Sequence, residues 1–168
     1  MTLRAYHHQS LTASIAGLLA VAPPLASPVG AQSPPAGAAQ STVVTTVSAA
    51  PFDSTLARLE RAITAKGLTI AARVDHAAAA ARANLTLRPT TLVIAGNPAA
   101  GTPLMLADQT MGVELPLRFL VWQGEDGKAR VSYDPIKAIA ARHRITGREE
   151  LLGRMTTAME SIVAEAVR

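Results

Sequence analysis

The chain has 168 residues, of which 49% are hydrophobic, 17% charged and 3% aromatic, and it contains no cysteine. This apolar content suits one ordinary domain and excludes a mainly disordered chain, and the lack of cysteine excludes disulfide scaffolds and thiol redox chemistry. The net charge is +4, but no aromatic residues alternate with the basic ones, so we expect no nucleic-acid partner.

The first 31 residues have the pattern of a secretory signal peptide. An apolar run from Leu11 to Ala22 precedes two prolines, and Val29-Gly30-Ala31 supplies the small residues that a signal peptidase needs. The run is shorter than the roughly 20 residues of a membrane span. We therefore predict cleavage after residue 31, a periplasmic or secreted product and no membrane span after cleavage. Residues 32–41 read as a flexible Pro/Ala-rich spacer, and residues 42–168 as a single domain.

The first half of that domain alternates strands with helical segments. Val and Thr residues predict a strand over 42–48, and a helix follows with Asp53 or Ser54 as its N-cap and Lys66-Gly67 as its end. Residues 68–74 alternate as a strand does, which places Leu68, Ile70, Ala72 and Val74 on one face. A short helical turn over 77–83 leads to a buried strand over 90–95.

The second half opens with a loop, from Gly96 to Gly101. Thr102-Pro103 then predicts a helix that begins at Pro103 and runs to about residue 113. Residues 117–123 and 128–133 read as a hairpin joined by Asp126-Gly127, and Asp134-Pro135 begins a helix to about residue 144. Thr146 and Glu149 form a capping box for a final amphipathic helix. The order predicts an α+β domain with an antiparallel sheet backed by helices, arranged strand, helix, four strands, helix, with extra short helices in the loops.

Four stretches of the sequence carry a resemblance to a known family. They are Gly96-Asn-Pro-Ala-Ala-Gly-Thr-Pro-Leu-Met105, Leu115-Pro-Leu117, Val131-Ser-Tyr-Asp-Pro135 and Arg142-His143. Together they resemble the domain-of-unknown-function family 302, over roughly residues 43–167. The resemblance implies a curved sheet of the TATA-binding-protein-like type and homodimers, and it implies no established activity.

The Gly96–Thr102 loop is the first candidate site. Free N–H groups at a helix start attract anions or oxygen-rich ligands, so Gly96, Asn97, Gly101 and Thr102 are candidate ligand-binding residues. The lysine of a phosphate-binding P-loop is missing after the second glycine. The alternative is a sharp turn in which Thr102 only caps its own helix and Asn97 only bonds to its own loop.

His76, Trp122, Tyr133 and His143 complete the set of candidate ligand-binding residues. Both histidines follow or end predicted elements, where an imidazole can act as a base or hydrogen-bond donor, or can simply pack. Trp122 and Tyr133 on the hairpin can line an apolar pocket, anchor a dimer, or pack within the sheet. No spacing of metal ligands stands out, so we predict no metal site and no cofactor.

These features lead to three hypotheses. We favour an exported, noncatalytic module that forms homodimers and binds a small molecule or anion. The alternatives are a periplasmic enzyme that uses a histidine base, such as His76, beside the Thr102 helix start, and a protein that handles metal or haem through His and Met. Proximity of His76 to Thr102 would favour catalysis.

Overall fold

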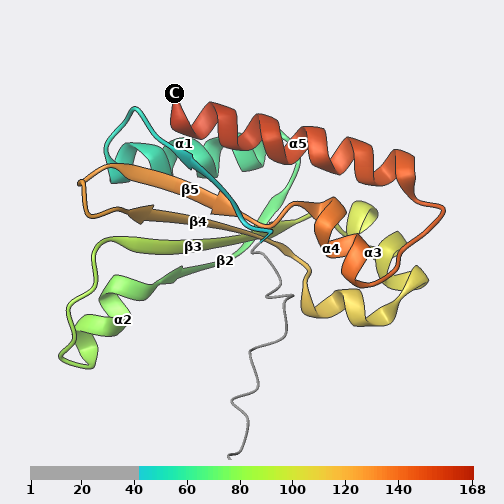
Figure 1. Cartoon of the computed structure of the whole chain (residues 1–168), viewed down its shortest axis with the longest axis horizontal. Coiled ribbons are helices and arrows are strands. Elements are labelled where there is room, and N and C mark those ends of the chain that lie inside the picture. Colours follow the sequence, from blue (N-terminus) through green and yellow to red (C-terminus); the bar gives the residue numbers. More distant parts are fainter. Residues whose placement is uncertain (1–41) are drawn as a thin grey trace, which may run out of the picture. The chain divides into compact units, whose positions relative to one another are not determined.

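The computed structural model describes residues 42–168, so the predictions for residues 1–41 lie outside the described residues. In chain order the elements are β1 (Val44–Val47), α1 (Phe52–Ala65), β2 (Thr69–Asp75), α2 (His76–Arg82), β3 (Thr90–Gly96), α3 (Pro98–Ala107), the 3-10 helix η1 (Gln109–Val113), β4 (Leu117–Gln123), β5 (Ala129–Tyr133), α4 (Ile136–Arg142) and α5 (Glu149–Val167). The predicted α+β architecture is confirmed (Figure 1).

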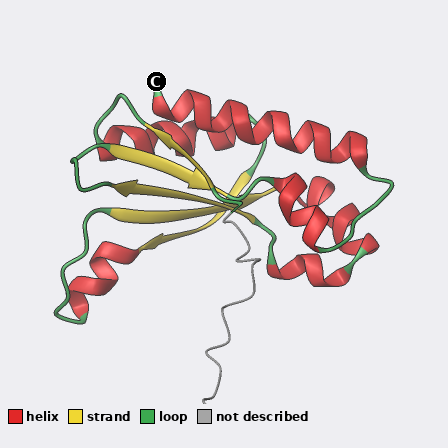
Figure 2. Ribbon diagram, viewed as in Figure 1, coloured by secondary structure: helices red, strands yellow, loops and turns green. Residues whose placement is uncertain are grey.

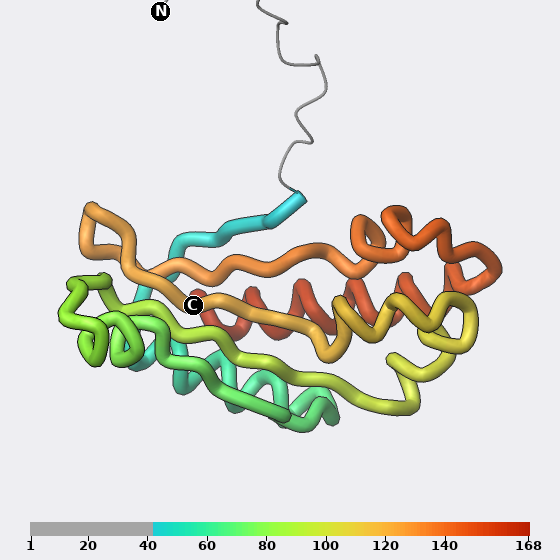
Figure 3. The backbone as a smooth tube through the Cα atoms, turned by 90° about the horizontal axis from the view of Figure 1, so that it is seen from below, coloured from blue at the N-terminus to red at the C-terminus, as the bar shows by residue number. Residues whose placement is uncertain are grey.

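The five strands form one antiparallel sheet in the order β1-β5-β4-β3-β2. Helices α1 and α5 cover one face of this sheet, whereas no described helix crosses the middle of the other face (Figures 2 and 3). The second face is called the open face below. Because side chains alternate along each strand, every central strand sends one set of residues toward the helices and one set toward the open face.

The core lies between the sheet and helices α1 and α5. On the helix side, Val93, Phe119, Val121 and Val131 are fully buried. The amphipathic stripe predicted for the final helix is present, since Met155, Met159 and Ile162 are buried against this layer. Burial of these side chains supplies the main stabilisation of the fold, at about 25 cal/mol for each square ångström of apolar surface.

The prediction that the apolar residues of β2 share one face is wrong. The pairing of β2 with β3 shifts between Ile70 and Ala72, so Ile70 lies opposite Ala95 on the helix side while Ala72 lies opposite Ile94 on the open face. An extra residue in a strand reverses the faces beyond it. The bulge therefore turns Ala72 and Val74 away from the core.

Helices α1, α4 and α5 begin at residues other than those predicted, and the N-cap of α4 is Pro135 rather than Asp134. Helix α1 begins at Phe52 with Pro51 as its N-cap, not with Asp53 or Ser54. Helix α5 begins at Glu149 with Arg148 as its N-cap, and the Glu149 carboxylate instead accepts a hydrogen bond from the Gly147 N–H, at 3.0 Å. The capping box expected of Thr146 and Glu149 is therefore absent. The hairpin and the end of α1 at Lys66-Gly67 are close to the predictions.

Candidate binding site

The segment that joins β3 to α3 differs most from its prediction. Helix α3 begins at Pro98, five residues before the expected start at Pro103, and Asn97 is its N-cap. The Asn97 side-chain oxygen accepts from the Ala99 N–H at 2.9 Å, and the Asn97 carbonyl accepts from the N–H groups of Ala100 and Gly101, both at 3.0 Å. Because Pro98 has no N–H, the first turn keeps no free amide for an anion. The helix start predicted from Thr102-Pro103 is wrong, and Thr102 lies inside α3, on its exposed side.

A hollow of about 400 Å³ lies beside this junction. Four of the predicted residues line it: Gly96, Asn97, Gly101 and Thr102. The other lining residues come from β2, α3, the start of β4 and α5, and they are Thr69, Ala71, Pro98, Met105, Leu115, Pro116, Leu117 and Met155. No charged side chain lines the hollow. Its chemistry is therefore apolar, with the side chains of Thr69, Asn97 and Thr102 as its polar groups.

Two glycines keep the walls of the hollow close together. A Cβ atom on Gly96 would lie 3.0 Å from the Cβ of Pro116, and one on Gly101 would lie 3.4 Å from the Cδ1 of Leu115. Since 3.0 Å is too short for two carbon atoms in contact, β3 and the segment before β4 can approach this closely only because residue 96 is glycine. Gly101 is less constrained, and a side chain there would extend into the space between Leu115 and the hollow.

His76 lies at the far end of the sheet from this hollow. Thr69 pairs with Gly96 near the hollow, whereas Asp75 pairs with Thr91, and His76 is the first residue of α2 immediately after Asp75. Six residues of strand correspond to about 20 Å. His76 therefore does not line the hollow and does not lie beside Thr102, so the pairing that the enzyme hypothesis required is not formed.

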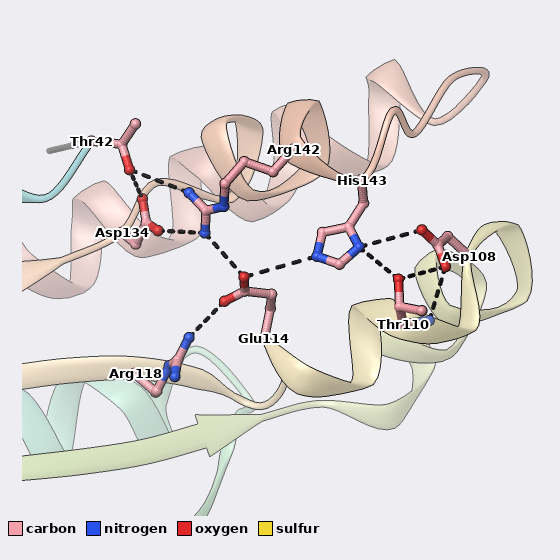
Figure 4. A network of polar contacts seen from close by, with 8 residues as sticks. All are labelled: Thr42, Asp108, Thr110, Glu114, Arg118, Asp134, Arg142 and His143. Atoms are coloured by element: carbon pink, nitrogen blue, oxygen red, sulfur yellow. Dashed lines mark hydrogen bonds and ion pairs between the residues drawn. The ribbon is translucent and has the colours of Figure 1, made fainter. Parts of the chain in front are cut away.

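His143 is the C-cap residue of α4 and lies in a polar cluster with η1 (Figure 4). Its Nδ1 atom is 2.9 Å from the Thr110 hydroxyl and 3.3 Å from the Asp108 carboxylate, and its Nε2 atom is 3.8 Å from the Glu114 carboxylate. Hydrogen bonds from the Thr110 hydroxyl and N–H, followed by the contact with His143, hold the pKa of Asp108 below its usual value. Both imidazole nitrogens thus face groups of this chain, and His143 does not line the hollow.

Arg142 extends the same cluster toward the sheet. Its guanidinium contacts the carboxylates of Asp134 at 2.7 Å and Glu114 at 3.2 Å, and Glu114 also accepts a hydrogen bond from Arg118 at 2.6 Å (Figure 4). Both contacts come from its Nη2 atom, while Nη1 donates to the Thr42 hydroxyl at 3.3 Å. The cluster therefore ties α4, η1 and β4 together, and its geometry indicates a structural role.

Trp122 and Tyr133 lie on opposite faces of the sheet. Trp122 is on the open face, where its indole N–H donates to the Ser132 hydroxyl at 2.8 Å and the Arg130 guanidinium lies 5.2 Å from the ring centroid. Tyr133 is buried on the helix side, with its ring 6.1 Å from that of Phe119. Burial, and then the charge of Glu160, raise the pKa of Tyr133. The two aromatic residues do not line a common pocket.

Sequence reasoning did not select several residues that line the hollow, among them Met105, Leu115 and Met155. Each belongs to a different segment, and in the sequence each reads as an ordinary apolar residue. Leu115 and Met105 did occur in the stretches that carried the family resemblance. Within residues 42–168 there is no group of three or more His, Asp or Glu side chains placed to hold a metal ion.

The comparison with protein families agrees with these stretches. Residues 43–162 match the model of the family described as domain of unknown function DUF302. The chain belongs to the DUF302 family. A crystal structure of an uncharacterised conserved DUF302 protein from Bacillus stearothermophilus is similar to this chain, with a TM-score of 0.68 and 14% sequence identity over 76% of this chain and 98% of that one. At this identity the likeness concerns the fold alone.

The curated relatives are proteins named fluoride-specific ion channel. FluC 1 from Brucella suis and FluC 1 from Brucella abortus are each 37% identical to this DUF302 chain over 112 residues, which is 67% of the chain. The match spans 44% and 42% of those relatives, less than half of their length. No helix in the described part of the DUF302 chain is both long and apolar enough to cross a bilayer.

Proposed function

We propose that this DUF302 domain is a noncatalytic binding module whose hollow beside Gly96–Thr102 takes a small apolar molecule. One observation carries the proposal: side chains from four separate segments converge on a space of about 400 Å³ without contributing a charge. Pockets for small molecules have volumes of roughly 300–1,000 Å³ and mainly apolar walls with a few polar groups. Thr69, Asn97 and Thr102 are the polar groups that would orient the ligand.

The positions of His76 and His143 favour binding over catalysis. A general base must come within hydrogen-bond reach of the group it deprotonates. His76 is about 20 Å of strand away from the hollow, and the nitrogens of His143 face Thr110, Asp108 and Glu114. The amides at the start of α3 already have acceptors, so an apolar ligand fits this site better than an anion such as fluoride.

We further propose that the domain forms a homodimer through the open face of its sheet. Leu92, Ile94, Leu120 and Trp122 lie on this face only half-buried, and Val74 beside them has 37% of its surface exposed. A second copy packed face to face would cover these side chains. If the export predicted from residues 1–31 takes place, both binding and dimerisation occur outside the cytoplasm.

The ligand proposal can be tested with a neutral probe. N-phenyl-1-naphthylamine fluoresces when it enters an apolar site, and we expect saturable binding to the wild-type domain. Gly101→Leu, which fills the hollow next to Leu115, should weaken binding at least tenfold. Gly153→Leu is the matched control, because a side chain at this helical glycine meets nothing within 4 Å and the residue does not line the hollow.

The proposal fails if the probe does not bind, or if it binds a folded Gly101→Leu domain as tightly as the wild type. Near-ultraviolet circular dichroism of Trp122, which lies far from Gly101 on β4, verifies that each variant is folded. Loss of binding in the Gly153→Leu control as well would show that the effect is not specific to the hollow and would equally contradict the proposal.

A further inference from the structure

A second hollow, of about 330 Å³, adjoins the first. The two share three lining residues: Asn97, Leu117 and Met155. The floor of the second hollow is again apolar and is formed by Leu68, Ala100, Leu151, Ala158, Met159 and Ile162. Two apolar spaces with a common wall can hold one ligand that is longer than either.

Met155 is the part of the wall between the two hollows that moves most readily, because its unbranched, flexible side chain adapts to its neighbours. Asn97 stays in place as the N-cap of α3, since its side-chain oxygen accepts from the Ala99 N–H at 2.9 Å. Its amide nitrogen holds the Gly67 carbonyl only at 3.4 Å, close to the limit for a hydrogen bond. Rotation of Met155 would join the hollows into one groove along the start of α3.

The two hollows differ in charge. No charged residue lines the first hollow, whereas Lys66 and Arg154 line the second. Lys66 lies 3.4 Å from the Glu165 carboxylate, and Arg154 contacts Glu150 one helical turn away. The Arg154–Glu150 pair is exposed and the Lys66–Glu165 pair is about one-third exposed, and ion pairs so open to solvent contribute little to stability. An incoming anionic group can therefore take the place of either acid.

We propose that the joined groove binds a single-chain amphiphile with a carboxylate headgroup. The alkyl tail occupies the uncharged hollow lined by Met105, Leu115 and Pro116, and the carboxylate lies between Lys66 and Arg154. Arginine matches a carboxylate with two parallel N–H donors, and lysine adds a second positive charge. This inference rests on the proposed function, since it names the ligand of the same hollow. The proposed ligand is a single dissolved amphiphile and not a lipid held in a bilayer, because its whole tail lies between α3, β4 and α5.

The test displaces the neutral probe with octanoate, decanoate and dodecanoate, and in parallel with the alcohols of the same lengths. Each added methylene should tighten binding about threefold to fourfold, the effect of burying one such group. At equal length, the carboxylate should bind about tenfold more tightly than the alcohol. The double substitution of Lys66→Met and Arg154→Met should remove this headgroup preference, so that carboxylates and alcohols of equal length compete equally. Lys128→Met, on the distant β4–β5 turn, is the control and should keep the preference.

A gain of affinity provides an independent check. Glu165→Gln removes the acid that competes for Lys66, so carboxylates should bind this variant a few times more tightly, with no change for alcohols. If the probe binds but carboxylates and alcohols of equal length compete equally, the headgroup inference is wrong while the proposed function stands. Binding to anionic phospholipid vesicles in place of free carboxylates would also overturn it. If neither probe nor amphiphile binds, both proposals fail.

Discussion

Asp126 and Arg130 face each other across the β4–β5 turn. The two guanidinium nitrogens of Arg130 donate to the two carboxylate oxygens of Asp126 at 2.8 and 2.9 Å. This contact, followed by the hydrogen bond from the Lys128 N–H, lowers the pKa of Asp126 to about 2. The folded-state pKa is then below the unfolded value of about 3.9, so the pair stabilises the fold above pH 4 and loses its effect as the pH falls toward 2.

We therefore predict an Asp126 titration midpoint near pH 2 by carbon-detected NMR. Arg130→Met should move the midpoint upward, toward about 3.9, because the charged partner is gone while the Lys128 amide stays. Arg118→Met removes a cation that pairs with Glu114 instead, and it should leave the midpoint unchanged. An unshifted midpoint in Arg130→Met would show that the contact does not persist in solution.

The roles of some single residues could be predicted from the sequence, and those of others could not. Asn97 was predicted to hydrogen-bond within its own loop or to bind a ligand, and its side chain caps α3 and also lines the hollow. The sequence also allowed Trp122 and Tyr133 to share a pocket wall. The register contradicts a shared wall, since Trp122 pairs with Arg130 and Tyr133 with Phe119. A two-residue turn at Asp126-Gly127 would have paired position 122 with 131 and put both rings on one face, whereas the observed connection leaves Gln123 paired with Ala129 and separates them.

At the scale of elements, periodicity was a better guide than capping rules. The hairpin and the stripe of α5 were predictable because alternation and helical spacing repeat over many residues. Helix starts depend on one or two side chains, so Thr102, a suitable cap in sequence, could not be told from Asn97, the cap in the structure. The β2 bulge was missed because an inserted residue leaves no compositional trace.

The caps of α3 and α2 should differ in their effect on stability. Asn97 caps α3, which inserts the fully buried Leu104 into the core, whereas Asp75 caps α2, which buries no residue. Asn97→Ala should lower the free energy of unfolding by about 1 kcal/mol, a usual value for a lost cap. Asp75→Ala should lower it much less, because α2 can fray while the core stays intact.

Urea denaturation followed by far-ultraviolet circular dichroism measures both variants of this pair. Equal losses for Asn97→Ala and Asp75→Ala would contradict the claim that α3 is coupled to the core and α2 is not.

At the scale of the whole molecule, the open face of the sheet leads to a prediction about assembly. Five strands about 4.8 Å apart and about 20 Å long present a flat area of roughly 500 Å² per copy. The accessible surface is larger than this flat area, because the side chains protrude from it. Specific interfaces of standard size bury about 800 Å² of accessible surface per partner, and small ones bury less. Leu92 and Leu120, which pair with each other, occupy the middle of this area, with Arg118 opposite Ile94 toward one end and Arg130 toward the other. An apolar centre with a charged rim is the usual composition of an interface.

We expect sedimentation velocity to give a dimer for the domain over residues 42–168. Leu120→Asp should convert it to a monomer, because a buried carboxylate without a partner is costly. Leu106→Asp, which makes the same change at a leucine on α3 with 80% of its surface exposed, should leave the dimer intact. A wild-type monomer at micromolar concentration would contradict the proposed dimer.

The hollow is formed by segments that are far apart in the sequence, so only part of its lining could be predicted. The sequence placed Gly96, Asn97, Gly101 and Thr102 at a candidate site, and all four line the hollow. Its apolar character depends on Met155, some fifty residues later, and on Leu115. Their convergence follows from the packing of α5 near the start of β4, which no local pattern encodes.

The bulge in β2 has one more consequence. This strand ends the sheet, and an outermost strand with free backbone groups invites end-to-end growth into fibrils. The irregularity at Ala71 breaks the even spacing of those groups, and Arg73, held by Glu60 at 3.6 Å, sets a charge beside them. Deleting Ala71 would remove the bulge, and the evenly spaced backbone groups of β2 could then pair with the edge strand of another copy.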